Sequence, residues 1–489
     1  MSAIIVILCL AAVIFMYFYN NPMKHGRWFM MRRFINWFPL GMSYAFLYMG
    51  RYNLNVSKVA LGSLMTKEEF GLIFGAGTIT YACSFLVNGP LVDRIGGKAG
   101  IIISSIGSAI ANVLIGILTY LVLTGRYHMN FVVAFAILYS LNMYFQSYGA
   151  VSIIKVKAYW FHVRERGVFG AIFGTLISFG VYFAFDWGQD IVDLLKAHTS
   201  GPGSWLSTTM KGIFALDGSS IIPVWAVFFI PAAIMVFWAL IDWIFIKNTP
   251  EEAGFPPFDT ADASTGEMDR VFTAGDLLKR VFLSPLMLTF AFIELTSGVL
   301  RNGIMQWYFI FANEVKQPGA EFFLQNWGLL LCIFGIIGGF MGGLVSDNFF
   351  RSRRGPPVAI FSAFMFVMAL VMAIFLTSSP FIVGTVSVLI VMAVTGVHSL
   401  MSGTAAADFG GRRATATSSG IVDGFVYLGT GIQSFSLGFL TTWNWHWWPV
   451  FLMPFALIGF YLATRIWNKL PDATRKYIHD VEKFDMIEV

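Results

Sequence analysis

The ten residues 89–98 read GPLVDRIGGK and connect one long apolar run to the next. A related stretch, GLVSD at 343–347, follows another apolar run and precedes its own cluster of arginines. The two aspartates, Asp93 and Asp347, are 254 positions apart. Because similarity at a long fixed offset marks duplicated structural units, this pair predicts a chain built from two copies of one unit.

Two further pairs of basic residues repeat at nearly the same interval. Arg51 and Arg301, each inside an apolar segment long enough to cross a bilayer, are 250 positions apart. Arg166 and Arg413, each in a basic loop, are 247 positions apart. Three landmarks at nearly one offset predict parallel repeats related by an axis along the membrane normal.

The composition identifies an integral membrane protein. Of the 489 residues, 57% are hydrophobic and only 12% are charged, whereas soluble domains carry roughly 25% charged residues. The apolar runs are long and do not alternate with polar residues, which predicts membrane-spanning helices and excludes barrel strands. We therefore expect an all-α polytopic membrane protein.

The apolar runs predict one extra N-terminal helix followed by two sets of six spans. The polar stretch between the sets holds seven acidic residues against three basic ones and is typical of a linker. The expected spans are 35–62, 69–91, 100–123, 130–154, 167–186 and 223–246, then 282–313, 323–346, 357–377, 380–406, 415–440 and 446–467. The expected domains are the extra transmembrane helix (1–22), an N-terminal bundle (23–247), a cytoplasmic linker (248–281), a C-terminal bundle (282–467) and a cytoplasmic tail (468–489).

The distribution of basic residues predicts the orientation. Residues 3–19 are apolar, with no basic residue before them and several directly after them. We interpret this run as a retained helix with its N-terminus outside, the alternative being a cleaved leader. Basic loops at alternate ends place the C-terminus in the cytoplasm and the segment 187–222 outside. A bacterial inner (plasma) membrane is the expected location.

Several classes of function are excluded or unsupported. Cys9, Cys83 and Cys332 lie in apolar runs at unrelated spacings, which suggests neither a disulfide framework nor a metal site. The basic residues form no stripe that would bind nucleic acid. No nucleophile–base set, cofactor motif or ATP-binding loop of the GxxxxGK[ST] type is present. We therefore expect neither an enzyme nor a primary pump.

The loop at 89–98 resembles the signature loop of the major facilitator superfamily, whose fold consists of two six-helix bundles. Its glycines permit a tight turn, and Asp93 stands where it can contact a helix N-terminus or a basic neighbour. The resemblance implies gating contacts at the same membrane face. The residues expected to make them are Asp93, Arg94, Arg166, Asp347 and Arg413.

Other motifs resemble the organophosphate:phosphate antiporter family within that superfamily. They are YMGRYN at 48–53, NTPEEAGFPP at 248–257, LRNGIMQW at 300–307, ADFGGRR at 407–413 and GIVDGFVYLG at 420–429. The resemblance covers about residues 30–467. It implies a phosphate site between two arginines, at the axis that relates the halves.

Elementary chemistry supports the same site. A guanidinium offers a planar fork of donors to two phosphate oxygens and stays charged at working pH. Two facing guanidiniums, from Arg51 and Arg301, can offset a dianion. The alternative is that one arginine pairs with a buried acid. Tyrosines that precede Arg51 on one helical face, or that match family positions, complete the expected substrate site: Tyr44, Tyr48, Tyr81 and Tyr427.

Four polar residues in apolar spans are candidates for coupling or selectivity. Glu294 lies seven positions before Arg301, too far along a helix for direct pairing, so it is either paired elsewhere or a proton site. Asp423 lies in the eleventh span. Asn142 and Gln146 share one helical face and can form hydrogen bonds between helices. His398 we interpret as a packed, satisfied histidine.

Two departures from the family pattern alter the expected substrate. The family lysine of the second span is replaced by Phe85, and the family histidine of the fifth span by Ile177. The anion site is then less basic than the family's, which suits a zwitterionic or larger organic phosphate, or proton coupling. The sequence does not specify the substrate.

We expect a secondary transporter of a phosphorylated organic anion that exchanges with inorganic phosphate by alternating access. One alternative is proton-coupled symport of another organic anion. Another is a non-transporting sensor or partner subunit, because the extra N-terminal helix offers a place for a protein partner. The expected partners are the bilayer and a small anion, with no nucleic acid, no cofactor and an unspecified oligomeric state.

Overall fold

The computed structural model describes the chain with defined gaps. The residues outside the description are 1, 20, 163–164, 197–204, 217–220, 258–259, 261–274, 276–278, 280–281, 351–352, 410 and 470–489. Side chains at 2–3, 166–171, 173, 347, 403–416 and 418–419 are also outside it. The predicted linker and tail fall mostly in these gaps, so the domain boundaries stay predictions.

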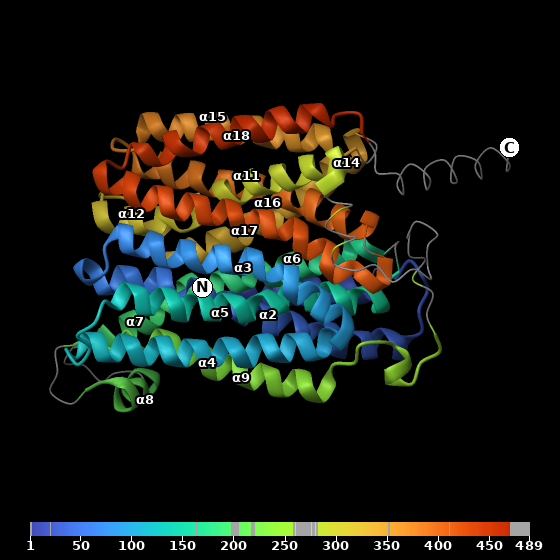
Figure 1. Cartoon of the computed structure of the whole chain (residues 1–489), viewed down its shortest axis with the longest axis horizontal. Helices are drawn as coiled ribbons and strands as arrows, with labels where there is room; N and C mark the ends of the chain where they lie inside the picture. The colour runs from blue at the N-terminus through green and yellow to red at the C-terminus, as the bar shows by residue number, and fades with distance from the viewer. Residues whose placement is uncertain are drawn as a thin grey trace.

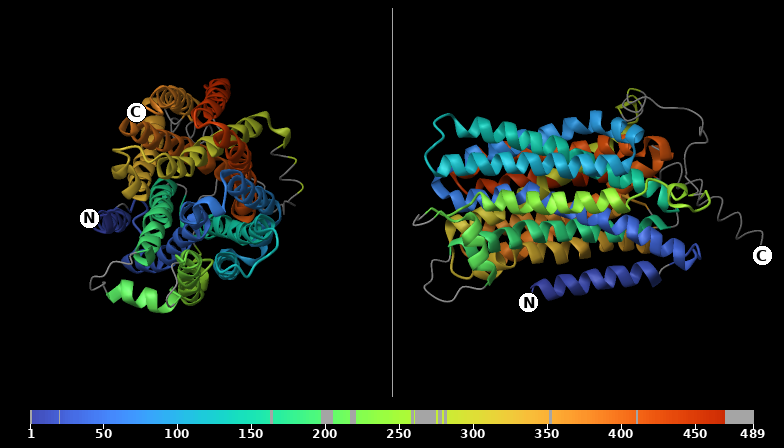
Figure 2. Two further views of the ribbon diagram at one scale, coloured as in Figure 1. Left: turned by 90° about the vertical axis from the view of Figure 1, so that its left-hand side faces the viewer. Right: turned by 90° about the horizontal axis from the view of Figure 1, so that it is seen from below.

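The described secondary structure is helical, and two six-helix bundles lie side by side (Figures 1 and 2). The first comprises α2 (Arg27–Leu61), α3 (Lys67–Ile95), α4 (Gly97–Leu123), α5 (Phe131–Trp160), α6 (Arg166–Tyr182) and α9 (Ala226–Phe245). The second comprises α11 (Pro285–Met305) with α12 (Trp307–Val315), α14 (Trp327–Phe350), α15 (Gly355–Phe375), α16 (Pro380–Phe409), α17 (Gly411–Trp443) and α18 (Trp447–Arg465). Within the described part of the chain, 8 helices are long and apolar enough to cross a membrane by themselves. The expected fold class is confirmed.

The structure departs from the expected spans at three places. The segment 187–222, expected as an external connection without a span, contains α7 (Gly188–Lys196) and α8 (Trp205–Phe214). The span expected at 167–186 ends in a π-helical segment, Phe183–Trp187, that leads directly into α7. The span expected at 282–313 is divided at Gln306 into α11 and α12. The π-helical segment and the break at Gln306 lie within apolar runs, and α7 and α8 are too short to appear as spans, so the search for long apolar runs did not reveal them.

Local signals in the sequence begin the helices. Thr66 caps α3 by accepting a hydrogen bond from the backbone N–H of Glu69, and the Glu69 carboxylate accepts one from the Thr66 N–H in return. Asn130 caps α5. Ser284 caps α11, and Pro285 follows it as the first helical residue. These caps fix where three membrane helices start.

The two bundles meet closely along α3 and α17 (Figure 1). A Cβ at Gly71 would lie 2.5 Å from the backbone oxygen of Ser434. A Cβ at Gly431 would lie 2.6 Å from the Ile79 side chain. Close contact between the backbones of membrane helices needs such small residues. Because neither glycine has a side chain, the two bundles can pack closely along α3 and α17.

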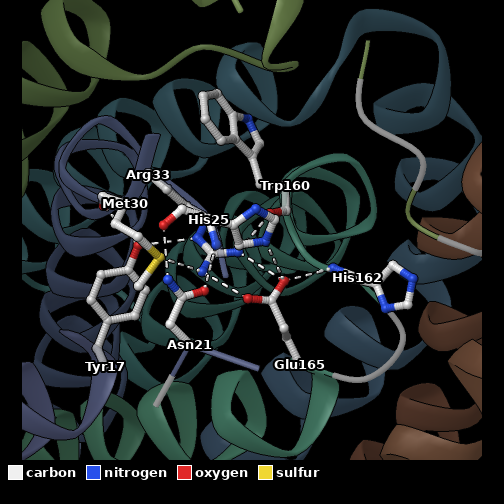
Figure 3. A network of polar contacts seen from close by, with 8 residues as sticks. All are labelled: Tyr17, Asn21, His25, Met30, Arg33, Trp160, His162 and Glu165. Atoms are coloured by element: carbon white, nitrogen blue, oxygen red, sulfur yellow. Dashed lines mark hydrogen bonds and ion pairs between the residues drawn. The ribbon is translucent and has the colours of Figure 1, made fainter. Parts of the chain in front are cut away.

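The extra helix α1 (Ser2–Tyr19) lies outside the first bundle, beside α6 (Figure 2). Its Tyr17 hydroxyl donates a 2.8 Å hydrogen bond to the Met30 carbonyl and accepts one of 3.0 Å from Nε of Arg33 (Figure 3). Arg33 in turn binds Glu165 through two contacts of 2.9 Å. The polar ends of α1, α2 and the loop before α6 are thus tied together.

Glu165 is the centre of this attachment. Burial alone would raise the pKa of Glu165, but hydrogen bonds from His25 and Arg33 lower it to about 2. The backbone N–H of His162 adds a bond of 3.0 Å to the same carboxylate. A carboxylate that stays ionised while only 2% exposed needs this number of donors.

Candidate functional site

Arg51 lies at the centre of the fold, on α2, and its side chain is fully buried. Its Nε donates a 2.9 Å hydrogen bond to Oε1 of Gln146 on α5. One terminal nitrogen donates to the Tyr81 hydroxyl on α3 at 3.2 Å. The other donates to the hydroxyl of Tyr427, which belongs to α17 of the second bundle. A single guanidinium therefore joins four helices and both bundles.

Aromatic rings surround the same charge. The Arg51 guanidinium carbon lies 4.6 Å from the ring centre of Tyr48, 4.7 Å from that of Tyr81 and 5.3 Å from that of Tyr427. These separations are within the range of cation–π attraction. Tyr44 is one layer further out, because its ring packs edge-on against Tyr48 with centres 5.4 Å apart. The structure thus brings all four predicted tyrosines to Arg51, three in contact and one behind.

The backbone of α2 at this point is held by α5. The Tyr139 hydroxyl donates to the Arg51 carbonyl at 3.0 Å, and Nδ2 of Asn142 donates to the Gly50 carbonyl at 2.9 Å. Gln146 Nε2 donates to Asn142 Oδ1 at 3.1 Å, which orients the amide that accepts from Arg51. Tyr139, Asn142 and Gln146 follow at spacings of three and four, so they share one helix face. That spacing was the signal by which Tyr139, absent from the predicted site, could have been found.

Arg301, on α11, is partly exposed and is less fully bonded. Its Nε is buried without a hydrogen-bond partner among the residues that the structure describes. Its charge interacts electrostatically with Tyr427 and Tyr48, the two tyrosines that also interact with Arg51. The two predicted arginines, which belong to opposite bundles, therefore both interact with the hydroxyl groups of Tyr48 and Tyr427.

The predicted acids lie near Arg301 without forming an ion pair with it in the described part of the chain. Glu294 Oε2 contacts Nδ1 of His398 at 3.0 Å, and Asp423 Oδ1 accepts a 3.1 Å hydrogen bond from Ser402. Electrostatic effects link both acids to Arg301 and His398. The described residues contain no group of three His, Cys, Asp or Glu placed to hold a metal ion. Glu294, expected to be either paired elsewhere or a proton site, thus contacts a histidine in the structure.

Position 85 changes the character of the site. The Phe85 ring packs edge-on against Tyr81, with centres 4.7 Å apart, and lies 6.2 Å from the ring of Tyr427. It fills with an aromatic surface the place that the family resemblance gives to a cation. Ile177, on α6, is half-buried and also apolar.

The end of the bundle that carries Asp93 is closed by a contact between the halves. Asp93 Oδ1 pairs with Nζ of Lys155 at 2.8 Å. Its Oδ2 accepts hydrogen bonds from the backbone N–H and the hydroxyl of Thr417, near the start of α17. Arg94 is exposed. The side chains of Arg166, Asp347 and Arg413 lie outside the described residues.

The opposite end is closed as well, by contacts that the sequence did not predict. Oδ1 of Asp186, in the π-helical segment, accepts a 2.7 Å hydrogen bond from the N–H of Gly328, and Oδ2 accepts one of 3.0 Å from the N–H of Leu329. These N–H groups are the free donors at the start of α14, where a helix favours negative charge. Lys67 and Glu314 add an ion pair of 2.8 Å between α3 and α12.

Comparison with known proteins gives a consistent family. The family model described as "Major Facilitator Superfamily" matches residues 40–185 and 203–434. A "Probable hexose phosphate transport protein" of Chlamydia trachomatis is 24% identical over 480 residues, covering 93% of this chain and 95% of the relative. A "Glycerol-3-phosphate transporter" of Bacillus subtilis is 24% identical and covers 82% of this chain and 85% of its own length. These are the functions of the relatives, and they are consistent with the organophosphate:phosphate antiporter family.

Two further comparisons complete the set. The "Membrane sensor protein UhpC" of Escherichia coli is 25% identical over 83% of this chain and 85% of the relative. Among solved structures, a bacterial homologue of the human lysosomal transporter Spinster aligns with a TM-score of 0.67 at 16% identity, over 91% of this chain and 98% of that chain. At 16% sequence identity, this structural similarity shows a shared fold and nothing more.

Proposed function

We propose that this chain, which belongs to the Major Facilitator Superfamily, is a secondary active transporter of a phosphorylated organic anion. In this proposal the anion exchanges with inorganic phosphate and binds between Arg51 and Arg301. The two bundles rock about that site to open each membrane face in turn.

One observation carries the proposal. Arg51 is 0% exposed, and its described hydrogen-bond partners are an amide and two hydroxyls, with no carboxylate among them. A buried charge without a counter-ion is costly in a membrane protein and signals a functional site. An anion that enters the site supplies the missing charge.

The chemistry of the surrounding groups favours phosphate as that anion. The hydroxyls of Tyr81 and Tyr427 occupy the positions that phosphate oxygens would take on the fork of Arg51. Arg301 adds a second fork with a free Nε from the other bundle. The printed names of the transporters among the relatives, for hexose phosphate and glycerol 3-phosphate, support a phosphate ester as substrate.

The contacts at the two ends suit alternating access. Opening one face requires the bonds of Asp93 to Thr417 to break, and opening the other requires those of Asp186 to α14 to break. Each set is small and polar, so either can break while the other holds. We propose from the basic loops that the Asp93 end faces the cytoplasm.

Exchange in proteoliposomes tests the proposal. With equal pH on both sides of the membrane, vesicles loaded with phosphate are expected to take up labelled hexose 6-phosphate or glycerol 3-phosphate, and empty vesicles are not. Arg51→Lys keeps the charge but loses the fork, so exchange should fall at least about a hundredfold, as expected for loss of paired charge-assisted bonds. Arg301→Lys should behave in the same way. Exchange at the wild-type rate in both variants excludes the arginine site.

A second outcome would favour the sensor, because one relative carries that printed name. In that case the purified chain would bind phosphate esters, and Arg51→Lys would abolish binding. Vesicles that contain the wild-type protein would nevertheless transport none of the ligand. Binding and exchange measured on one preparation therefore separate the two functions.

A further inference from the structure

A buried group of titratable side chains lies in the second bundle beside Arg301. Glu294, on α11, is 0% exposed. Its Oε2 accepts a 3.0 Å hydrogen bond from Ser297 and one of 3.0 Å from Nδ1 of His398 on α16. Its Oε1 is buried with no hydrogen-bond partner in the described part of the chain. Such an oxygen is unfavourable on a carboxylate and far less so on a neutral acid.

The charges that act on this group come from three helices. His398 interacts with Glu294 and Arg301 of α11 and with Asp423 of α17. Asp423 interacts with His398, Glu294 and Arg301. It also accepts a hydrogen bond from Ser402. Tyr427 of α17 interacts with Asp423 and Arg301. These groups are coupled, so the charge on one alters the protonation of the others.

The other helices that pack against this group bring no charge at the same level. α14 meets α16 through Gly338 and Gly342, and α18 meets α11 through Gly459 beside Thr296. The sequence of α15 contains no titratable side chain. In α6, titratable residues occur only at its two ends. The net charge at this level of the second bundle therefore depends on two acids, one histidine and one arginine.

Anion binding disturbs this balance. Arg301 carries the fixed positive charge that acts electrostatically on Glu294 and Asp423. A phosphate on Arg301 places negative charge beside both acids and offsets that effect. Repulsion between like charges then favours proton uptake by the group. By linkage, a bound proton strengthens anion binding equally.

We propose that Glu294, His398 and Asp423 form a proton-binding site that fills when an anion binds to Arg301, so that anion and proton cross the membrane together. This inference rests on the proposed function and specifies what is coupled to it. At the repeat position of Glu294, 250 residues earlier, the N-terminal bundle carries Tyr44 in place of an acid. The proposed proton site therefore belongs to one bundle only, whereas the arginine pair has one member in each bundle.

His398 provides the route by which a proton reaches Glu294. The His398 side chain is 25% exposed while that of Glu294 is 0% exposed. Because a carboxylate only accepts hydrogen bonds, Nδ1 of the neutral ring carries the proton that faces Glu294. Uptake of a proton at Nε2, with transfer of the Nδ1 proton to Oε2, leaves a neutral ring and a neutral acid. Release runs the same steps in reverse. The complete burial of Glu294 fits a proton better than a cationic group of a substrate.

Two transport measurements with labelled inorganic phosphate test the proposal. Exchange between phosphate-loaded vesicles and external phosphate at equal pH needs no net proton movement. Net uptake of phosphate into phosphate-free vesicles under an inward pH gradient, in contrast, requires that protons move with the anion. With one proton per anion, each pH unit should raise the wild-type accumulation about tenfold. Glu294→Gln should lose this gradient response and keep exchange. His398→Asn, which retains a donor near Nδ1 but cannot titrate, should also lose the response.

Asp242 of α9 offers a matched control. It is also 0% exposed, also accepts from a serine (Ser43), and also has one buried oxygen without a described partner. It lies in the other bundle. Asp242→Asn should therefore keep the full gradient response. An equal loss in Asp242→Asn, or an unchanged response in Glu294→Gln, overturns the proposal.

Infrared spectroscopy separates failure of this inference from failure of the proposed function. If the wild-type protein exchanges no phosphate, the transport proposal fails, and protonation of Glu294 is still measurable on the purified chain. The infrared pH-difference spectrum of the wild type should contain a carbonyl stretch of a neutral carboxylic acid that belongs to Glu294. This one component should be missing from the spectrum of Glu294→Gln, while the bands of the other buried acids remain. A spectrum identical in the two proteins overturns the proton site independently of transport.

Discussion

The hydroxyl of Tyr52 donates a 2.7 Å hydrogen bond to Oδ1 of Asn302, across the boundary between the two bundles. Tyr52 directly follows Arg51, and Asn302 directly follows Arg301, so the two bonded residues are also 250 positions apart. Both are buried. The repeat thus positions two arginines and bonds their neighbours to each other at the same level of the membrane.

This bond should contribute measurably to the stability of the closed structure. Tyr52→Phe leaves the Asn302 oxygen without its closest donor, which costs about 1–3 kcal/mol for a buried polar group. We expect the thermal midpoint of Tyr52→Phe to fall, and that of Asn302→Ala to fall as well. The double variant should lose no more than the larger of the two single losses, because both remove one interaction. Fully additive losses would contradict the bond.

Gln146→Glu should supply Arg51 with an internal counter-ion. The change is nearly isosteric and places a carboxylate oxygen where the amide oxygen now lies, 2.9 Å from Nε. The free protein should be at least as stable as the wild type, and the thermal stabilisation caused by phosphate or its esters should disappear. Gln325→Glu, at an exposed position, serves as the control and should keep the ligand response. A retained ligand shift in Gln146→Glu would show that the charge of Arg51 is not the binding group.

The arrangement of helices was largely predictable from the sequence, because twenty-residue apolar runs and basic loops reflect the thickness and chemistry of the bilayer. The short helices α7 and α8 and the break at Gln306 were not. The break at Gln306 lies inside an apolar run, whereas α7 and α8 are short and carry polar residues between the apolar ones, so neither short helix is marked by a long apolar run. Capping and π-helical geometry depend in addition on tertiary contacts. Asp186 shows this dependence, since its partners at the start of α14 are more than 140 positions away.

Some of the residues and contacts that form the candidate site could be predicted from the sequence. Tyr48 and Arg51 share a helix face, so their contact follows from local spacing. The bond between Arg51 and Tyr427 spans 376 positions. Only the family resemblance placed Tyr427 in the expected site, and it did not suggest this bond. The pairing of Glu294 with His398 was not predicted, because His398 on its own is an ordinary packed histidine. Pairings between helices depend on rotation and depth, which one sequence does not specify.

Asp186→Asn and Asp93→Asn should shift the protein in opposite directions. Each removes the charge from a carboxylate that bonds one bundle to the other, at opposite ends of the molecule. Charge-assisted bonds to a helix start contribute about 0.3–2 kcal/mol, so the open fraction at that end should rise up to about thirtyfold. Spin labels at exposed positions 129 and 325 should separate in Asp186→Asn, and labels at 251 and 469 should separate in Asp93→Asn. If both variants open the same end, the two aspartates do not act as opposing latches.

The attachment of α1 should depend on pH through Glu165. Its pKa is about 2 in the folded protein, below the ordinary value of 4.5, so the ionised form is stabilised by folding. A difference of this size corresponds to about 3 kcal/mol. Because the folded pKa is the lower one, this contribution is complete above about pH 4.5 and is lost as the pH falls toward 2.

The variant Glu165→Gln tests this pH dependence. It removes the stabilising contribution of the carboxylate at every pH and leaves Arg33, only 1% exposed, without its counter-ion. The difference in unfolding free energy between wild type and Glu165→Gln should therefore be largest at pH 7 and shrink steadily below pH 4.5, when both are measured in the same detergent. Glu321→Gln, at an exposed site, should show no such pH-dependent difference. A difference between wild type and Glu165→Gln that stays constant from pH 7 to pH 3 would mean that the Arg33–Glu165 pair does not hold α1 through its charge.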